Sequence, residues 1–208
     1  MNRDDSMNAR IQKELQHAVA TMKTYHRRMD LTLAPLEADM YFALSHLVSD
    51  KKNQQFWRRT IIRCVLAYIE ALTWNLKNGI PIIASVSWIK LTPADLEIIK
   101  EQRTIESDGR TEVRPKFLKF RDNLKATFSL FGKVHGEAFL VKCDQDFDAL
   151  CKTYDLRNRL MHPKGPMDPD VSDTDIKNSQ RGLCWLSSEY RRLFERCIQA
   201  IPKIANCK

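Results

Sequence analysis

Three polar side chains near the carboxyl end of the chain have the types and the spacing for chemistry on a phosphodiester. Arg157 is followed directly by Asn158, and His162 comes five residues after the arginine. A histidine transfers protons near neutral pH, an arginine holds phosphate oxygens with a permanent charge, and an asparagine can orient either group. RNA cleaves when its 2′-OH attacks the adjacent phosphorus, provided that protons move and the charge on phosphorus is stabilised. The trio predicts metal-independent RNA cleavage to a 2′,3′-cyclic phosphate, with no cofactor.

This segment resembles the signature of HEPN superfamily ribonucleases: an Arg, usually followed by a polar residue, then a His at the end of a helix, with four to six residues between the Arg and the His. The resemblance extends more loosely over roughly residues 55–200, where Glu70 is similar to an acidic residue often found in the corresponding helix. It implies catalytic roles for Arg157, Asn158 and His162, with Glu70 supporting them. It also implies a setting in toxin–antitoxin systems, stress or antiviral defence, with an antitoxin or another regulatory protein as a partner.

The spacing by itself is weak, because about one such Arg-to-His match is expected by chance in a chain of this composition. Arg10 and His17 match it as well, but no polar residue follows Arg10 and both lie inside an expected helix. Arg157 differs because Pro163 disfavours helical backbone at His162 and so ends the helix there. The alternative interpretation is that Arg157 and His162 only interact with the dipole of a helix carboxyl end.

The helical geometry between the arginine and the histidine predicts a dimer. Five residues along a helix rotate the side-chain direction by about 140° and rise about 7.5 Å, so Arg157 and His162 do not share one face. Two copies meeting about a two-fold axis would bring both pairs to one groove. We therefore expect a homodimer with a composite active site, as the resemblance also implies.

Other charged residues are expected near this groove. Arg159 and Lys164 are predicted to bind the RNA backbone, although each could equally be a solvated charge. Glu70 could instead be the ion-pair partner of an arginine. Some HEPN toxins carry, two positions after the His, a Tyr that a partner nucleotidyltransferase modifies, and Lys164 at this position argues against such control.

Apolar periodicity predicts that these residues belong to an all-α, HEPN-like bundle of about five main helices. Helices are expected at about 7–29, 35–48, 61–76, 116–134, 144–161 and 173–198, with a short one at 92–102. Asn78-Gly79 is expected to end the third of them, and Phe117 to join an aromatic core stripe. Residues 104–113 could form a small β-hairpin around Asp108-Gly109 or an irregular loop. Residues 80–90 are left unassigned.

Composition favours a single domain over residues 1–208, with N-terminal helices at 1–54 and the HEPN-like core at 55–200. The chain has 43% hydrophobic and 29% charged residues, as ordinary globular proteins do. Its net charge of +8 suits RNA as a partner, although a soluble protein can also simply be basic. Scattered cysteines and the lack of a long apolar run predict a cytoplasmic protein without membrane contact. The alternative function is a non-catalytic helical module that binds RNA, a nucleotide or a protein partner through its dimer face.

Overall fold

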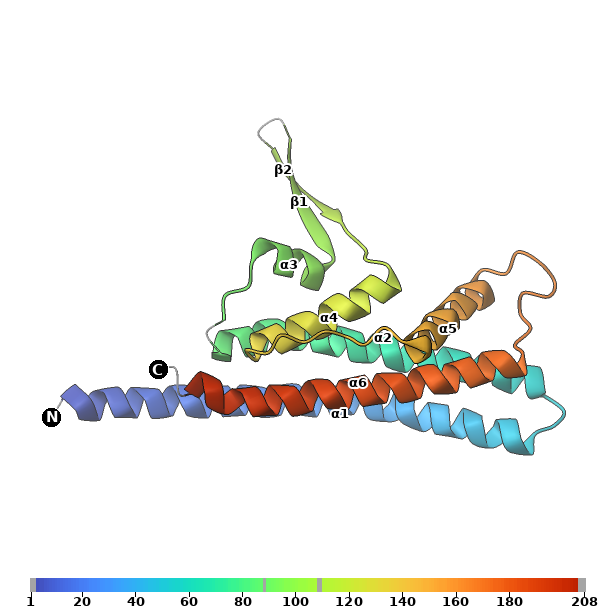
Figure 1. Cartoon of the computed structure of the whole chain (residues 1–208), viewed down its shortest axis with the longest axis horizontal. Coiled ribbons are helices and arrows are strands. Elements are labelled where there is room, and N and C mark those ends of the chain that lie inside the picture. Colours follow the sequence, from blue (N-terminus) through green and yellow to red (C-terminus); the bar gives the residue numbers. More distant parts are fainter. Residues whose placement is uncertain (1–2, 88, 108–109, 206–208) are drawn as a thin grey trace.

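The computed structural model describes residues 3–87, 89–107 and 110–205, and helix α2 (Gln54–Ser87) lies at the centre of its all-α bundle (Figure 1). Helix α2 packs against α1 (Arg3–Ser49), α3 (Pro93–Lys100), α4 (Phe120–Val134), α5 (Gln145–Met161) and α6 (Asp173–Ala205). Its central position follows from its apolar stripe, which recurs every three to four residues and is fully buried. The stripe consists of Ile61, Ile62, Val65, Leu66, Ile69, Leu72, Leu76 and Ile80.

Helix α1 is a single helix, so the prediction of two helices separated before Pro35 is wrong. Pro35 cannot donate to the carbonyl of Leu31, but both side chains are exposed, and water can serve that carbonyl instead. Buried side chains occur on both sides of the proline and pack as one face on α2, which outweighs the lost hydrogen bond. They are Tyr25, Met29, Met40 and Ala43.

Helix α2 continues past Asn78-Gly79 to Ser87, so the predicted stop at this pair is also wrong. Gly79 serves close packing between helices instead: a Cβ at this position would lie 2.4 Å from Cζ of Tyr25. The Tyr25 hydroxyl donates to the carbonyl of Asn75 at 3.1 Å, and burial raises the pKa of this phenol. The glycine therefore allows α1 to approach α2 closely, and the unassigned residues 80–87 are helical.

The short helix α3 begins as predicted. The Thr92 side chain accepts from the backbone of Asp95, and the Asp95 carboxylate accepts from the backbone of Thr92, which completes a capping box. The same carboxylate pairs with Lys133 of α4 at 2.6 Å. Burial alone would raise the pKa of Asp95, but the bonds from Lys133 and Thr92 lower it overall. This cap therefore also ties α3 to α4.

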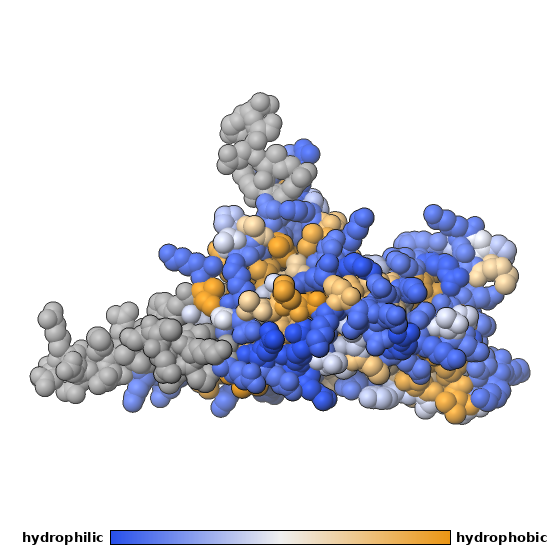
Figure 2. All heavy atoms as spheres, in the orientation of Figure 1, coloured by the Kyte–Doolittle hydropathy of each residue, from blue (hydrophilic) through white to orange (hydrophobic). Residues whose placement is uncertain are grey.

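The predicted hairpin is confirmed. Strands β1 (Gln102–Ser107) and β2 (Arg110–Pro115) pair antiparallel, with Thr104 opposite Val113. Asp108 and Gly109, the expected turn, lie outside the described residues. The hairpin projects from the bundle beside α3 (Figure 1), and Figure 2 shows apolar side chains gathered below it, over α3 and α4.

Helix α4 starts at Phe120, later than predicted, because residues 116–119 follow strand β2 without forming a helix. The backbone N–H of Lys116 donates to the carbonyl of Glu101 at 2.6 Å, which holds this segment extended. Phe117 consequently lies outside the helix and is 79% exposed, so its predicted place in the core is wrong. The rest of the aromatic stripe packs as predicted, with Leu124, Phe128 and Phe131 buried.

Helices α5 and α6 form an adjacent pair; α5 has the predicted boundaries, and α6 begins as predicted but continues past the predicted end near residue 198 to Ala205. Asp144 caps α5 with bonds to two backbone N–H groups, and Ser172 and Asp175 form the cap of α6. The two helices approach so closely at Gly182 that a Cβ there would lie 2.7 Å from Cα of Leu150. Helix α6 runs along α1 (Figure 1), where the hydroxyl of Tyr190 lies 3.6 Å from the sulfur of Met29.

Candidate functional site

The predicted catalytic residues lie at the carboxyl end of α5. This helix buries Phe147, Leu150, Leu156 and Leu160 against the bundle, which fixes the direction of its last two turns. Helical backbone ends at Met161, and His162 has φ −133° and ψ 62°. Pro163 explains this ending, because its ring disfavours helical backbone at the residue before it.

Arg157 is held against α2 by an ion pair. Its Nη2 lies 3.4 Å from Oε1 of Glu70, and its Nη1 lies 3.4 Å from Oδ1 of Asn158. The arginine side chain is 31% exposed and the glutamate side chain 45% exposed, so water reaches both. The structure therefore brings together three of the predicted site residues, and Glu70 makes the arginine ion pair that the sequence offered as its alternative role.

His162 lies at the start of the loop that joins α5 to α6. Its side chain is exposed, and its backbone N–H donates to the carbonyl of Asn158 at 3.0 Å. Among the described residues, no hydrogen bond or ion pair joins the imidazole to Arg157.

The loop itself is anchored at both ends. Near its start, the Asp168 carboxylate accepts from the backbone N–H groups of Lys164 and Gly165 at 2.6 and 2.9 Å. Near its end, Val171 exchanges hydrogen bonds with Gln55 and its carbonyl accepts from Arg58 at 2.9 Å.

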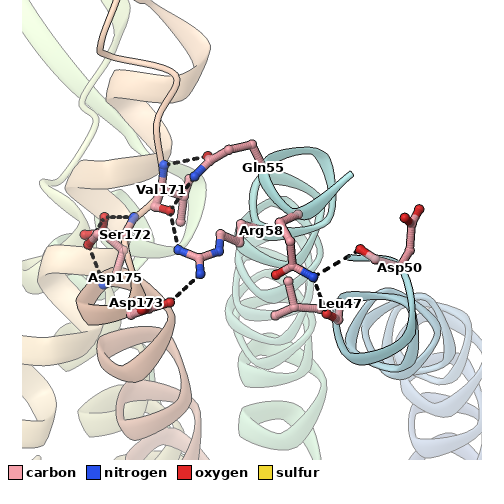
Figure 3. Close-up of polar contacts among 9 residues, drawn as sticks. Leu47, Asp50, Gln55, Arg58, Val171, Ser172, Asp173 and Asp175 are labelled. Carbon is pink, nitrogen blue, oxygen red and sulfur yellow. Dashed lines mark hydrogen bonds and ion pairs between the residues drawn. The ribbon is translucent and has the colours of Figure 1, made fainter. Parts of the chain in front are cut away.

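The end of the loop joins helices α2 and α6. Figure 3 shows Arg58 reaching from α2 to both Val171 and Asp173, while the cap formed by Ser172 and Asp175 lies beside them. These contacts fix where the loop enters α6.

The two residues predicted to bind RNA differ in their surroundings. Arg159 turns toward α6, with Nη2 3.2 Å from the carbonyl of Asp170 and 3.8 Å from Oδ2 of Asp175. Lys164 is exposed on the loop. Arg159 thus has a structural role in holding the loop, whereas Lys164 lies where a backbone phosphate could reach it.

Sequence reasoning missed a cavity that touches this site. Glu70 lines a cavity of about 230 Å³ together with Trp74, Lys77 and Tyr154. Tyr154 lies three residues before Arg157 on α5, and Trp74 lies one turn after Glu70 on α2. Helical spacing places Trp74 on the same face as Glu70, which was the signal in the sequence. The remaining walls come from the segments around α3 and α4, which no local pattern connects with α5.

The described residues contain no group of three or more His, Cys, Asp or Glu side chains that could hold a metal ion. In the same part of the chain, no helix has the length and apolar character needed to cross a bilayer. Comparisons of this chain with protein-family models, with curated proteins and with solved structures gave no match.

Proposed function

We propose that this protein is a metal-independent endoribonuclease of the HEPN type, acting as a dimer through Arg157, Asn158 and His162. The observation that carries the proposal is the contrast at the end of α5: Arg157 is oriented by Glu70 and Asn158, while His162 is exposed beyond the helix. An oriented cation and an accessible proton carrier are the two groups that cleavage by the 2′-OH requires.

The reaction proceeds by internal attack. The 2′-oxygen forms a bond to phosphorus and the bond from phosphorus to the 5′-oxygen breaks, giving a 2′,3′-cyclic phosphate and a 5′-OH. One imidazole takes the proton of the 2′-OH, and the leaving 5′-oxygen receives a proton from a second one. The arginines stabilise the charge that develops on the phosphorane oxygens. Two histidines in these roles come from two copies of the chain, which is why the proposal includes a dimer.

The direct test is incubation of purified protein with RNA in EDTA. We expect wild-type protein to cleave, and Arg157→Ala and His162→Ala to lose at least about 100-fold in rate, as when one transition-state donor is removed. Matched controls are Arg191→Ala and His17→Ala, which change exposed residues elsewhere. Cleavage by all five proteins at one rate, or by none of them, would refute the proposal. End-group analysis should find the cyclic phosphate.

Coexpression of the wild-type chain with the Arg157→Ala/His162→Ala double variant tests the composite site. The mixed dimer holds one arginine and one histidine, so one of the two proton carriers that the reaction needs is missing. We expect its rate to fall to the level of the single variants. A mixed dimer that keeps the activity of its one intact chain would show instead that each chain uses only its own residues.

The biological setting of the proposal follows from the resemblance. We place the activity in the cytoplasm, in a toxin–antitoxin, stress or antiviral response, with an antitoxin or another regulatory protein as partner.

The second candidate function is a module that binds RNA without cleaving it. It is favoured by the exposure of Trp74, which is 62% exposed beside the cavity and could stack on a base. Steeply salt-dependent binding without product would support it.

A further inference from the structure

The cavity beside Glu70 has the size and shape of a site for one flat ring. Its volume is about 230 Å³, below the roughly 300–1,000 Å³ that is typical of pockets for drug-sized ligands. It is bounded by α2, by the start of α4 and by α5. Its walls comprise Glu70, Thr73, Trp74, Lys77, Glu101, Leu118, Phe120, Asn123, Leu124 and Tyr154.

The cavity adjoins the proposed catalytic groups directly. Glu70 belongs both to its wall and to the ion pair with Arg157. Tyr154 stacks on Phe120 with ring centroids 4.2 Å apart and planes 10° from parallel, so this wall is a pair of parallel aromatic rings. A ring in the cavity would therefore belong to a nucleotide next to the phosphate that Arg157 holds.

Polar side chains on the opposite wall of the cavity can form hydrogen bonds with a ligand. Lys77, whose side chain is only 6% exposed, pairs with Glu101, and Nδ2 of Asn123 donates to the same carboxylate at 3.3 Å. Oδ1 of Asn123 is buried, and nothing in the described residues donates to it. A buried acceptor without a donor is unfavourable, so an N–H from a ligand in the cavity would satisfy it.

Trp74 lies between this cavity and two neighbouring ones. It lies on the wall of this cavity and of two others, one of about 320 Å³ that includes Lys100 and Phe117, and one of about 750 Å³ that includes Arg28. Exposed aromatic rings between basic side chains are how proteins bind successive bases of single-stranded nucleic acid. The indole is therefore placed to stack on the base that follows the one in the cavity.

We infer that this cavity binds one base of single-stranded RNA, with Asn123 contacting its edge and Trp74 stacking on the next base. The base is one with an exocyclic amino group, and adenine fits best, because its amino group and N7 match the two ends of an amide. The assignment rests on the proposed function for the identity of RNA as ligand. It adds a base preference that the catalytic residues alone do not supply.

The test measures binding, so that it does not depend on cleavage. Fluorescence anisotropy with 2′-O-methyl hexamers, which cannot be cleaved because the 2′-oxygen is blocked, compares an adenine-containing with an all-uracil oligomer. Wild-type protein should prefer the adenine oligomer by about 5- to 150-fold. Equal affinity of wild-type protein for the two oligomers would overturn the inference, whatever the variants do.

Variants assign the preference to residues. Asn123→Ala should remove the adenine preference and leave binding of the uracil oligomer unchanged, whereas an equal loss for both would contradict a role in reading the base. Trp74→Ala should weaken both oligomers by about 5- to 150-fold, and Trp74→Phe should restore most of the affinity. Phe56→Ala, at another exposed aromatic side chain of α2, is the matched control and should have no effect. A loss in Phe56→Ala equal to that in Trp74→Ala would refute the role of Trp74.

A competition experiment separates RNA from a free nucleotide as the source of the base. Adenosine monophosphate should displace the adenine oligomer only at a much higher concentration, because it lacks the neighbouring base and phosphates. Displacement at concentrations equal to that of the oligomer would overturn the assignment to RNA. Should Arg157→Ala retain full cleavage while the adenine preference holds, the nuclease proposal fails and the base site stands.

Discussion

Replacing Glu70 tests whether its ion pair with Arg157 mainly stabilises the fold or mainly positions the arginine for catalysis. At 3.4 Å, two opposite charges in water attract by about 1.2 kcal/mol, and measured exposed pairs contribute about 0.2–1 kcal/mol. Both side chains are about a third or more exposed, so the lower range applies. Glu70→Ala should therefore reduce the free energy of unfolding by less than about 1 kcal/mol, or a few degrees in Tm.

The effect of Glu70→Ala on catalysis should be larger than its effect on stability. Without the carboxylate the guanidinium of Arg157 can move, and misplacing a catalytic group by about 1 Å can reduce the rate by about 100-fold. We expect kcat to fall by about 10- to 100-fold with KM little changed. Glu70→Gln keeps an oxygen that can accept from Nη2, and it should recover most of kcat.

The assay is steady-state cleavage of a labelled RNA in EDTA over a range of RNA concentrations, run beside thermal unfolding of each variant. Arg157→Ala defines the floor of activity. Wild-type rates in both Glu70 variants, with Arg157→Ala inactive, would refute the positioning role. A loss of stability above about 2 kcal/mol in Glu70→Ala would instead show that the pair is not screened by water as its exposure indicates.

Two further predictions concern the bundle. Gly182→Ala should destabilise the protein by about 1–3 kcal/mol in urea unfolding, because its Cβ would meet the backbone of Leu150. Gly165→Ala should change stability little, because its Cβ would meet only Oδ2 of Asp168, at 4.0 Å; equal effects would refute the packing argument. Burial and the nearby charge of His26 lower the pKa of His135, so the unfolded chain takes up this proton at higher pH than the folded chain does. The contribution of His135 to the free energy of unfolding should be complete above about pH 6.5 and should fall as the pH falls through the lower pKa of the folded state. His135→Gln should flatten this pH dependence between pH 7.5 and 5.5. An unchanged slope would refute the assignment to His135.

The sequence predicted the helices well where local signals and packing agreed. Helix α5 begins at the single cap residue Asp144, helix α6 begins at the pair Ser172 and Asp175, and the hairpin follows from alternating residues around a turn. Predictions failed where tertiary packing overrides a local stop signal. Pro35 is a signal for the start of a new helix and Asn78-Gly79 for the end of one, but the contact between α1 and α2 continues across both, and Gly79 is required by Tyr25 of the other helix.

The candidate site was predictable in its residues but not in its surroundings. Arg157, Asn158 and His162 lie in one short segment, so spacing and a terminating proline are enough to find them. The inward turn of Arg159 depends on Asp175, which the loop brings back from α6. The cavity depends on three helices and on Asn123, far from Arg157 in sequence. Such surroundings are set by packing alone.

Arg157 can keep its ion pair with Glu70 while it binds a phosphate. A guanidinium has five N–H donors in a fixed plane, and the contacts to Glu70 and Asn158 use one on each of Nη1 and Nη2. Three donors therefore remain for phosphate oxygens while the carboxylate keeps the plane in place. The negative charge of Glu70 partly offsets the attraction of the arginine for RNA in the ground state. In the proposed mechanism, however, the same orientation is already set when charge develops on phosphorus, so the pair would favour the transition state over simple RNA binding.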